Sequence, residues 1–180
     1  MTIIIKFIDD IEHKYNSFEE ILKLDNYNDI IHINCSNNNL SSLPELPNSL
    51  TKLWCDNNNL SSLPELPNSF THLYCGYNNL SYLPNLPNSL RIIWCYNNNI
   101  SSLPKLPNSL RHFYYSTNPI YDHIYKYFGG NKTIYFEHQY NMKRKFVNKI
   151  GNWYLDCKYN PKYLYCRNRL MKEYKELYGK

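Results

Sequence analysis

Apolar and polar residues along the chain follow a pattern that repeats every 20 residues. Four copies align without gaps: residues 30–49, 50–69, 70–89 and 90–109. Residues 37–49 are identical to residues 57–69, and a partial fifth copy begins at Leu110. A fixed period of this length predicts stacked structural units rather than independent helices and strands.

The first part of each copy has the alternation of a short strand. In the second copy, the apolar residues Leu53 and Cys55 alternate with Lys52, Trp54 and Asp56. Because successive side chains of a strand point to opposite faces, this order predicts one buried and one solvent-facing side. Stacked copies then form a parallel sheet with strands about 4.8 Å apart.

The second part of each copy has a different spacing, set by paired prolines. Leu63 and Leu66 lie three residues apart in the segment LPELP. Proline fixes its own φ and pushes the preceding residue toward extended conformations, so a polyproline-like arm with three residues per turn would direct both leucines inward. Each copy is therefore predicted to be a strand, a turn and an extended return arm.

One asparagine recurs where each predicted strand ends. The positions are Asn38, Asn58, Asn78, Asn98 and Asn118. Backbone groups lose their sheet partners at this point, and an amide side chain both donates and accepts hydrogen bonds in a small volume. We therefore expect these residues to form a structural Asn ladder inside the coil.

The order of residues in each copy resembles LxxLxLxxNxL, the pattern of leucine-rich repeats. It is most similar to the short 20-residue class with LPxLPxS in the return arm, found in bacterial type III effectors and in repeat proteins of giant DNA viruses. The resemblance covers residues 30–120. It implies an α/β fold: a curved solenoid with a parallel sheet on the concave side, extended convex arms, and a role in protein recognition.

The segments on either side of the repeats do not follow the period. Residues 1–29 are predicted to cap the first coil, with a strand over residues 2–8. Ser17 as N-cap and Glu20 at N3 predict a capping box that opens a helix through about Leu24. Residues 121–180 switch to helical spacing and are predicted to form a small basic, Tyr-rich α-helical module.

Charge supports a division of the chain near Pro119. Residues 1–118 carry 7 basic and 10 acidic groups, whereas residues 119–180 carry 13 and 5. The chain has 27 Asn, 19 Tyr and no Ala, a bias that AT-rich codons partly explain and that we treat as background. It contains neither an apolar run of membrane-spanning length nor a signal peptide, so a cytoplasmic location is expected, the host cytoplasm if the protein is viral.

Candidate chemical groups recur with the repeat, and structural roles account for them. Cys35, Cys55, Cys75 and Cys95 occupy a buried apolar position, and strands about 4.8 Å apart are too widely spaced for relaxed disulfides. Histidines at one repeat position, two copies apart, lie too far from one another to share a metal ion. The effectors that carry this repeat bear a ubiquitin ligase domain, but Cys157 lies in DCK and lacks their Cys-x-Asp arrangement. We therefore expect neither enzymatic activity nor a cofactor or metal.

The most informative surface lies between the two buried positions of each strand. It carries Asn34, Trp54, Tyr74, Trp94 and Tyr114, so four successive copies place an aromatic residue on the concave side. The predicted polar rim consists of Lys52, Asp56, His72, Arg91, Tyr96 and Arg111. Exposed Trp and Tyr dominate binding hot spots, so we expect this stripe to bind a protein, from the host cell if the chain is viral. Alternatives are that the flanking module or a dimer partner covers the rings, or that they stabilise the sheet by cross-strand stacking.

A second functional hypothesis concerns the C-terminal module. With its net charge of +8, its eleven Tyr and the cluster Lys143, Arg144 and Lys145, it could bind nucleic acid or another polyanion. Many of these tyrosines fall on the face that should pack, and codon bias inflates both Lys and Tyr. No membrane partner is expected.

Overall fold

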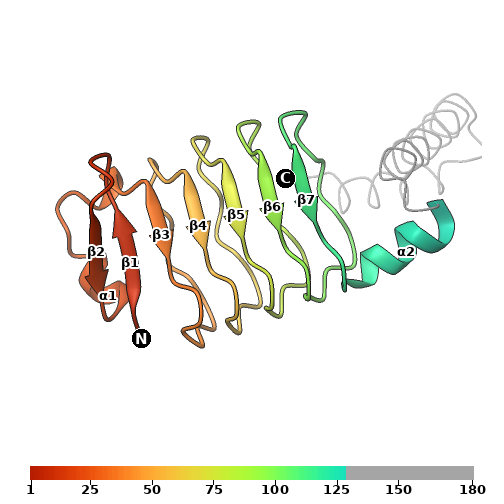
Figure 1. Cartoon of the computed structure of the whole chain (residues 1–180), viewed down its shortest axis with the longest axis horizontal. Coiled ribbons are helices and arrows are strands. Elements are labelled where there is room, and N and C mark those ends of the chain that lie inside the picture. Colours follow the sequence, from red (N-terminus) through yellow and green to blue (C-terminus); the bar gives the residue numbers. More distant parts are fainter. Residues whose placement is uncertain (129–180) are drawn as a thin grey trace, which may run out of the picture. The chain divides into compact units, whose positions relative to one another are not determined.

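The computed structural model describes residues 1–128, which contain one seven-stranded sheet in the order β2-β1-β3-β4-β5-β6-β7 (Figure 1). The strands are β1 Ile3–Lys6, β2 Glu12–Tyr15, β3 His32–Asn34, β4 Lys52–Trp54, β5 His72–Tyr74, β6 Ile92–Trp94 and β7 His112–Tyr114. The helices are α1 Phe18–Ile21, the 3₁₀ helix η1 Tyr27–Asp29 and α2 Pro119–Phe128.

The repeats form a parallel solenoid, as the 20-residue period predicts. From β3 to β7, each strand pairs in parallel with the next, and equivalent repeat positions lie opposite one another, as Leu53 does with Leu73. The central residue of β3 to β6 is fully buried, as are Cys35, Cys55, Cys75 and Cys95. The alternation read from the sequence therefore separates interior from solvent correctly.

The return arms contain no helix, but their two leucines are not equally buried. Leu63 and Leu83 are 6% and 5% exposed, whereas Leu66 and Leu86 are only half-buried. In these two copies the first leucine is therefore an interior residue, as expected, while the second is covered only in part. Leu66 directly precedes the turn in which the Phe70 N–H donates to the Pro67 carbonyl, where the arm already bends back toward the next strand.

The N-terminal segment extends the sheet instead of merely covering it. Strand β1 pairs antiparallel with both β2 and β3, so a hairpin continues the sheet beyond the first repeat. The predicted strand over residues 2–8 is shorter, and β2 was not predicted at all. The pairing also places Lys6 opposite His32, which brings cap residues onto the same face as the repeats.

The short helix α1 follows only half of the expected capping box. The Ser17 hydroxyl accepts from the Glu20 N–H at 3.3 Å, as predicted. The Glu20 carboxylate, however, accepts from the N–H of Asn16 at 3.0 Å and not from that of Ser17. The helix ends at Ile21 rather than near Leu24, with Leu22 as C-cap.

The recurring asparagines join neighbouring coils inside the solenoid. The Asn78 amide accepts from the N–H of Leu60 at 3.0 Å and donates to the carbonyls of Cys55, Cys75 and Gly76 at 3.0, 3.2 and 3.2 Å. Asn58, Asn98 and Asn118 are buried and bonded in the same way. Asn38, in the first copy, instead donates to and accepts from the Thr2 backbone of the cap.

The residue before each of these asparagines adopts a left-handed backbone conformation. Its φ is 60° at Asn37, 53° at Asn57, 51° at Tyr77, 51° at Asn97 and 54° at Thr117. Asparagine tolerates this region better than most non-glycine residues, whereas β-branched residues are strongly disfavoured there. The turn therefore favours Asn37, Asn57 and Asn97, although Tyr77 and Thr117 adopt the same conformation in the other two copies.

Helix α2 follows the last partial copy. The N–H of Ile120 donates to the carbonyl of Ile100 at 3.0 Å, and Ile120 and Ile124 are buried. Among residues 1–128, no helix is long and apolar enough to cross a membrane. The helices predicted over residues 129–180, and with them most of the C-terminal module, lie outside the described residues.

Candidate functional site

The solvent-facing side of β3 to β7, which we call the strand face, carries two parallel rows of side chains. The first row is at the first residue of each strand: His32, Lys52, His72, Ile92 and His112. The second, which we call the aromatic stripe, consists of Trp54, Tyr74, Trp94 and Tyr114 at the last residue of each strand, preceded by Asn34. Strand pairing aligns both rows across the solenoid.

The rings of the aromatic stripe contact one another from strand to strand. Trp54 and Tyr74 stack at 5.3 Å between ring centroids with an interplanar angle of 5°. Tyr74 with Trp94 and Trp94 with Tyr114 form edge-to-face pairs at 5.0 and 5.5 Å. Such pairs stabilise a sheet, so cross-strand stacking accounts for part of the stripe. It does not bury the rings, because Trp94 is 39% and Tyr114 is 54% exposed.

Lys52 in the first row, with Arg91 and Arg111 one residue before β6 and β7, adds positive charge beside the aromatic stripe. The His32 ring contacts Trp54 at 5.9 Å and the His72 ring contacts Tyr74 at 6.4 Å, so the two rows touch. Burial, followed by the charge of Lys52, lowers the pKa of both His32 and His72, and Arg91 also lowers that of His72. Lys52, Arg91 and the histidines therefore share one electrostatic environment.

The basic groups of this region differ in whether a carboxylate neutralises them. Lys6 forms salt bridges to Asp10 and Glu12, at 3.2 and 3.5 Å between nitrogen and oxygen. Lys52, Arg91 and Arg111 form no salt bridge with any other residue of the described part of the chain. No acidic side chain of the described residues therefore neutralises their charge by direct contact.

Two of the predicted rim residues, Asp56 and Tyr96, each lie two residues after the C-terminal end of a strand. Neighbouring groups hold both side chains in place. The Asp56 carboxylate accepts from the N–H of Gly76 at 2.9 Å, and burial raises its pKa. The Tyr96 ring lies over Gly76, where an added Cβ would come within 2.9 Å of it, and contacts Tyr77 at 5.3 Å. These two residues order the edge of the strand face.

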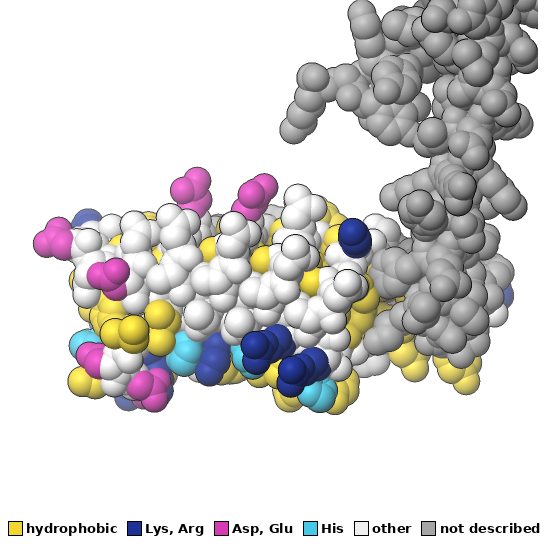
Figure 2. Space-filling model, turned by 90° about the horizontal axis from the view of Figure 1, so that it is seen from above, with side chains coloured by type: hydrophobic (Ala, Val, Ile, Leu, Met, Phe, Trp, Pro, Cys, Tyr) yellow, Lys and Arg dark blue, Asp and Glu magenta, His cyan; other side chains and the backbone are white. Residues whose placement is uncertain are grey.

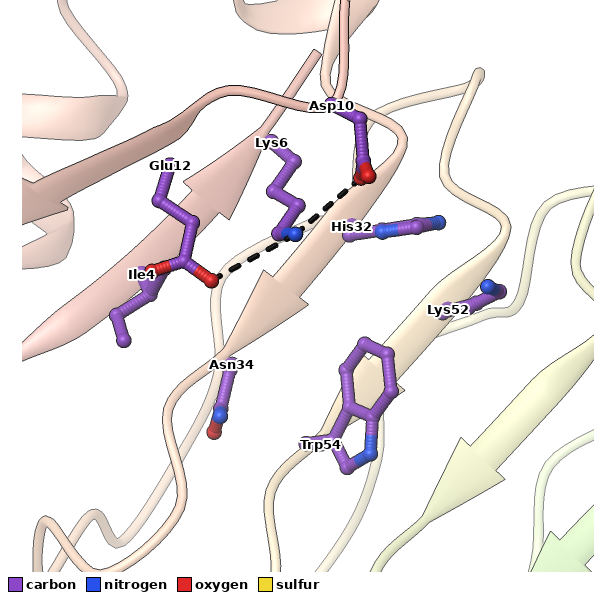
Figure 3. Close-up of a pocket in the computed structure, with 8 residues that line it drawn as sticks. All are labelled: Ile4, Lys6, Asp10, Glu12, His32, Asn34, Lys52 and Trp54. Carbon is purple, nitrogen blue, oxygen red and sulfur yellow. Dashed lines mark hydrogen bonds and ion pairs between the residues drawn. The ribbon is translucent and has the colours of Figure 1, made fainter. Parts of the chain in front are cut away.

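A pocket of about 370 Å³ lies at the N-terminal end of the strand face (Figure 3). Ile4, Lys6, Asp10 and Glu12 come from the cap, while His32, Asn34, Lys52 and Trp54 come from the first two repeats. In Figure 3, the Lys6 ammonium lies between its two carboxylate partners, and Lys52 lies apart from them near His32. The repeat pattern does not reveal the cap residues of this pocket, because they lie outside the repeat and only strand pairing brings them there.

The cysteines have the properties of interior residues rather than of reactive groups. Burial raises the pKa of the Cys35 thiol to about 12, and it raises those of Cys55 and Cys75 as well. The thiols of Cys35 and Cys55 donate to the carbonyls of Trp54 and Tyr74 at 3.5 and 3.4 Å. Within the described residues, no group of three or more His, Cys, Asp or Glu side chains could hold a metal ion.

Comparisons with solved structures place this architecture among known folds. YopM, a leucine-rich effector protein from Yersinia pestis, matches with 39% identity over 53% of this chain and 28% of that chain, at a TM-score of 0.50. The fold is a leucine-rich repeat solenoid. An LRR domain of a Shigella effector matches with 34% identity over 48% of this chain and 49% of that chain, at a TM-score of 0.45. YopM from Yersinia enterocolitica matches with 33% identity over 48% and 24%, at a TM-score of 0.44.

These matches concern the repeats and not whole proteins. The chain spans 49% of the Shigella domain and about a quarter of the two YopM chains. No protein-family model matches the sequence, and no curated protein matches it.

Proposed function

We propose that this chain is a non-enzymatic protein-interaction module and that the aromatic stripe binds its protein partner. The observation that carries the proposal is the exposure of Trp94 and Tyr114 in a continuous row of four rings, although the interior beneath them is already filled. Large aromatic residues on a surface, held rigid by their neighbours, lose little conformational entropy on binding and form typical hot spots. The likeness to leucine-rich repeats of effector proteins supports the same class of function.

The contacts between the rings are compatible with binding. Edge-to-face pairing fixes the orientation of Trp94 and Tyr114 while leaving a large part of each side chain in water. A partner therefore meets a preorganised surface rather than one that must be ordered first. Lys52, His72, Arg91 and Arg111 would supply the polar rim on one side of the stripe, and Asp56 and Tyr96 on the other.

We further propose that the chain belongs to the short leucine-rich repeat class of bacterial effectors and giant DNA viruses. The gapless 20-residue period and the LPxLPxS arms support this assignment. Residues 1–29 would act as cap, residues 30–120 as the binding solenoid and residues 121–180 as a basic module. A protein of this class would meet its partner in the cytoplasm, that of the host if the chain is viral.

The proposal can be tested by removing two rings of the aromatic stripe without changing any interior residue. The double variant Trp54→Ala/Trp94→Ala should no longer capture a protein partner from cytosolic extract. Tyr82→Ala is the matched control, because Tyr82 is 52% exposed but lies in a return arm, away from the strand face. Circular dichroism should show unchanged secondary structure in both variants. Capture retained by the double variant would refute the role of the stripe.

A further inference from the structure

We propose that the strand face selects an acidic, extended peptide segment. Its carboxylates would meet Lys52, Arg91 and Arg111, which we call the basic row, while its apolar side chains would meet the aromatic stripe. The inference deepens the proposed function and rests on it, because it names the chemistry of the partner for the same surface.

Charge complementarity is the first argument. Lys52, Arg91 and Arg111 are not neutralised by any described carboxylate, although residues 1–118 as a whole carry more acidic than basic groups. Figure 2 shows that Lys, Arg and His side chains gather along one edge of the solenoid, with acidic side chains among them only at its left end, while other acidic side chains protrude from the opposite edge. The strand face is therefore locally basic in a solenoid that is acidic overall. Such a patch favours anionic partners and disfavours cationic ones.

The acidic groups of the strand face do not cancel this preference. Asp10 and Glu12 are both bound to Lys6, and Asp56 accepts from the Gly76 amide. Each carboxylate therefore already has an internal partner. A cationic peptide would meet carboxylates whose charge is already partly offset by Lys6 or by a backbone amide, whereas an anionic peptide can pair with Lys52, which has no carboxylate partner among the described residues.

The spacing of the two rows indicates an extended segment. The first row, which includes Lys52, and the aromatic stripe are two residues apart along each strand, which corresponds to about 6.7 Å at the rise of a β-strand; Arg91 and Arg111 lie one residue before the first row. Side chains of an extended peptide alternate in direction, so one laid across the strands would turn alternate residues toward the basic row and the remainder toward the aromatic stripe. The pocket beside Lys52, His32 and Trp54 would hold its first acidic or apolar side chain.

The arrangement of the rings favours a peptide over a single-stranded nucleic acid. Stacking of bases needs accessible ring faces. The faces of Trp54 and Tyr74 cover each other, with planes only 5° apart. That stacking removes one face of each of these two rings from contact with bases, while the Tyr hydroxyls and the Trp N–H groups of the stripe suit the carbonyl and carboxylate oxygens of a peptide.

The experiment uses the full chain with Trp153→Phe, so that its remaining tryptophans, Trp54 and Trp94, both report from the strand face. Fluorescence titration compares a random copolymer of glutamate and tyrosine with a copolymer of lysine and tyrosine of equal tyrosine content. We expect the glutamate copolymer to bind at least tenfold more tightly than the lysine copolymer. A tenfold ratio is about what three exposed ion pairs contribute together. Its affinity should also fall steeply with added salt.

Variants locate the selectivity on the strand face. Lys52→Gln/Arg91→Gln/Arg111→Gln should lower the affinity for the glutamate copolymer about tenfold. Two controls should leave it unchanged: Lys105→Gln in a return arm, and Lys143→Gln/Arg144→Gln/Lys145→Gln in the C-terminal module. Circular dichroism confirms that each variant is folded.

Three results would overturn the inference: equal binding of both copolymers, full affinity in the triple variant of the basic row, or tighter binding of an oligothymidylate with the same dependence on that row. The last result would indicate nucleic acid as the occupant. Failure here is distinguishable from failure of the proposed function. If the double Trp variant still loses capture of a protein partner, the aromatic stripe remains a binding surface and only its acidic preference is refuted.

Discussion

The return arms and the strand face belong to the same repeats, yet they differ in how much the sequence varies from copy to copy. The arm segment SSLPELPNS occurs unchanged in residues 41–49 and 61–69, and residues 101–109 differ from it only at Lys105. The first position of the strands, by contrast, is His, Lys, His, Ile and His. An interior position of a strand keeps its apolar character, as Ile33 and Leu53 show, whereas a solvent-facing position can carry residues suited to a partner.

The turn between the two regions follows the rule of the interior. There the ladder Asn satisfies backbone groups of its own coil and of the preceding one, so its identity is fixed by geometry. On the strand face, Lys52, His72 and Ile92 occupy equivalent places without changing the register. At buried positions the repeated residue therefore reflects a structural demand, whereas the solvent-facing strand positions are free to serve binding.

The largest expected effect separates the ladder from the exposed asparagines beside it. Asn78→Ala removes four hydrogen bonds to the backbone and leaves buried groups unpaired, which should lower the free energy of unfolding by about 3 kcal/mol. Asn79→Ala, at an exposed neighbouring position, should change it by less than about 0.5 kcal/mol. Urea denaturation measures both, and equal midpoints would contradict the role of the ladder.

An intermediate effect concerns the left-handed turn position. Thr117 is exposed and β-branched at a φ of 54°, where three of the other four copies have Asn. Thr117→Asn should raise the free energy of unfolding by about 1 kcal/mol, because it removes backbone strain without deleting a buried contact. The reciprocal variant Asn97→Thr should lower it by a similar amount. Thermal unfolding of both would test the assignment, and two changes of the same sign would refute it.

The smallest expected effect lies on the strand face and concerns pH. In the folded state, burial and then Lys52 lower the pKa of both His32 and His72. Arg91 lowers the pKa of His72 further. At His32, Lys6 and His72 lower the pKa as well, whereas Asp10 raises it. Because the unfolded chain then binds protons more readily, stability should be complete above about pH 6.5 and decline as the pH falls below it.

The decline in stability should be modest, since both rings are only half-buried and solvent screens their interactions. Denaturation at a series of pH values would measure it. The variant Lys52→Gln should reduce it, because one of the charges that oppose protonation is gone. An unchanged slope in this variant would show that Lys52 does not act on the histidines.

Much of the solenoid could be predicted from local spacing. The alternation around Leu53 and Cys55 and the prolines of LPELP reflect contacts that recur in every copy. The same local pattern therefore indicates the same structure several times along the chain. The cap offered no such repetition, and β2 was missed because its pattern, exposed at Glu12 and Lys14 and half-buried at His13 and Tyr15, carries no strong apolar signal. Likewise, the length of α1 depended on the tertiary contacts around Ile21 rather than on its capping residues.

The sequence by itself determined the period, the interior positions, the place of the Asn ladder and the row of aromatic residues, because each follows from the chemistry of a few neighbouring residues repeated in register. Only the tertiary structure decided which charges are neutralised, how the rings pack and where a pocket forms. Lys6 reaches Asp10 and Glu12, and meets His32, through pairing of β1 with β2 and β3. Such pairings join residues without a shared local pattern, and no spacing along the chain encodes them.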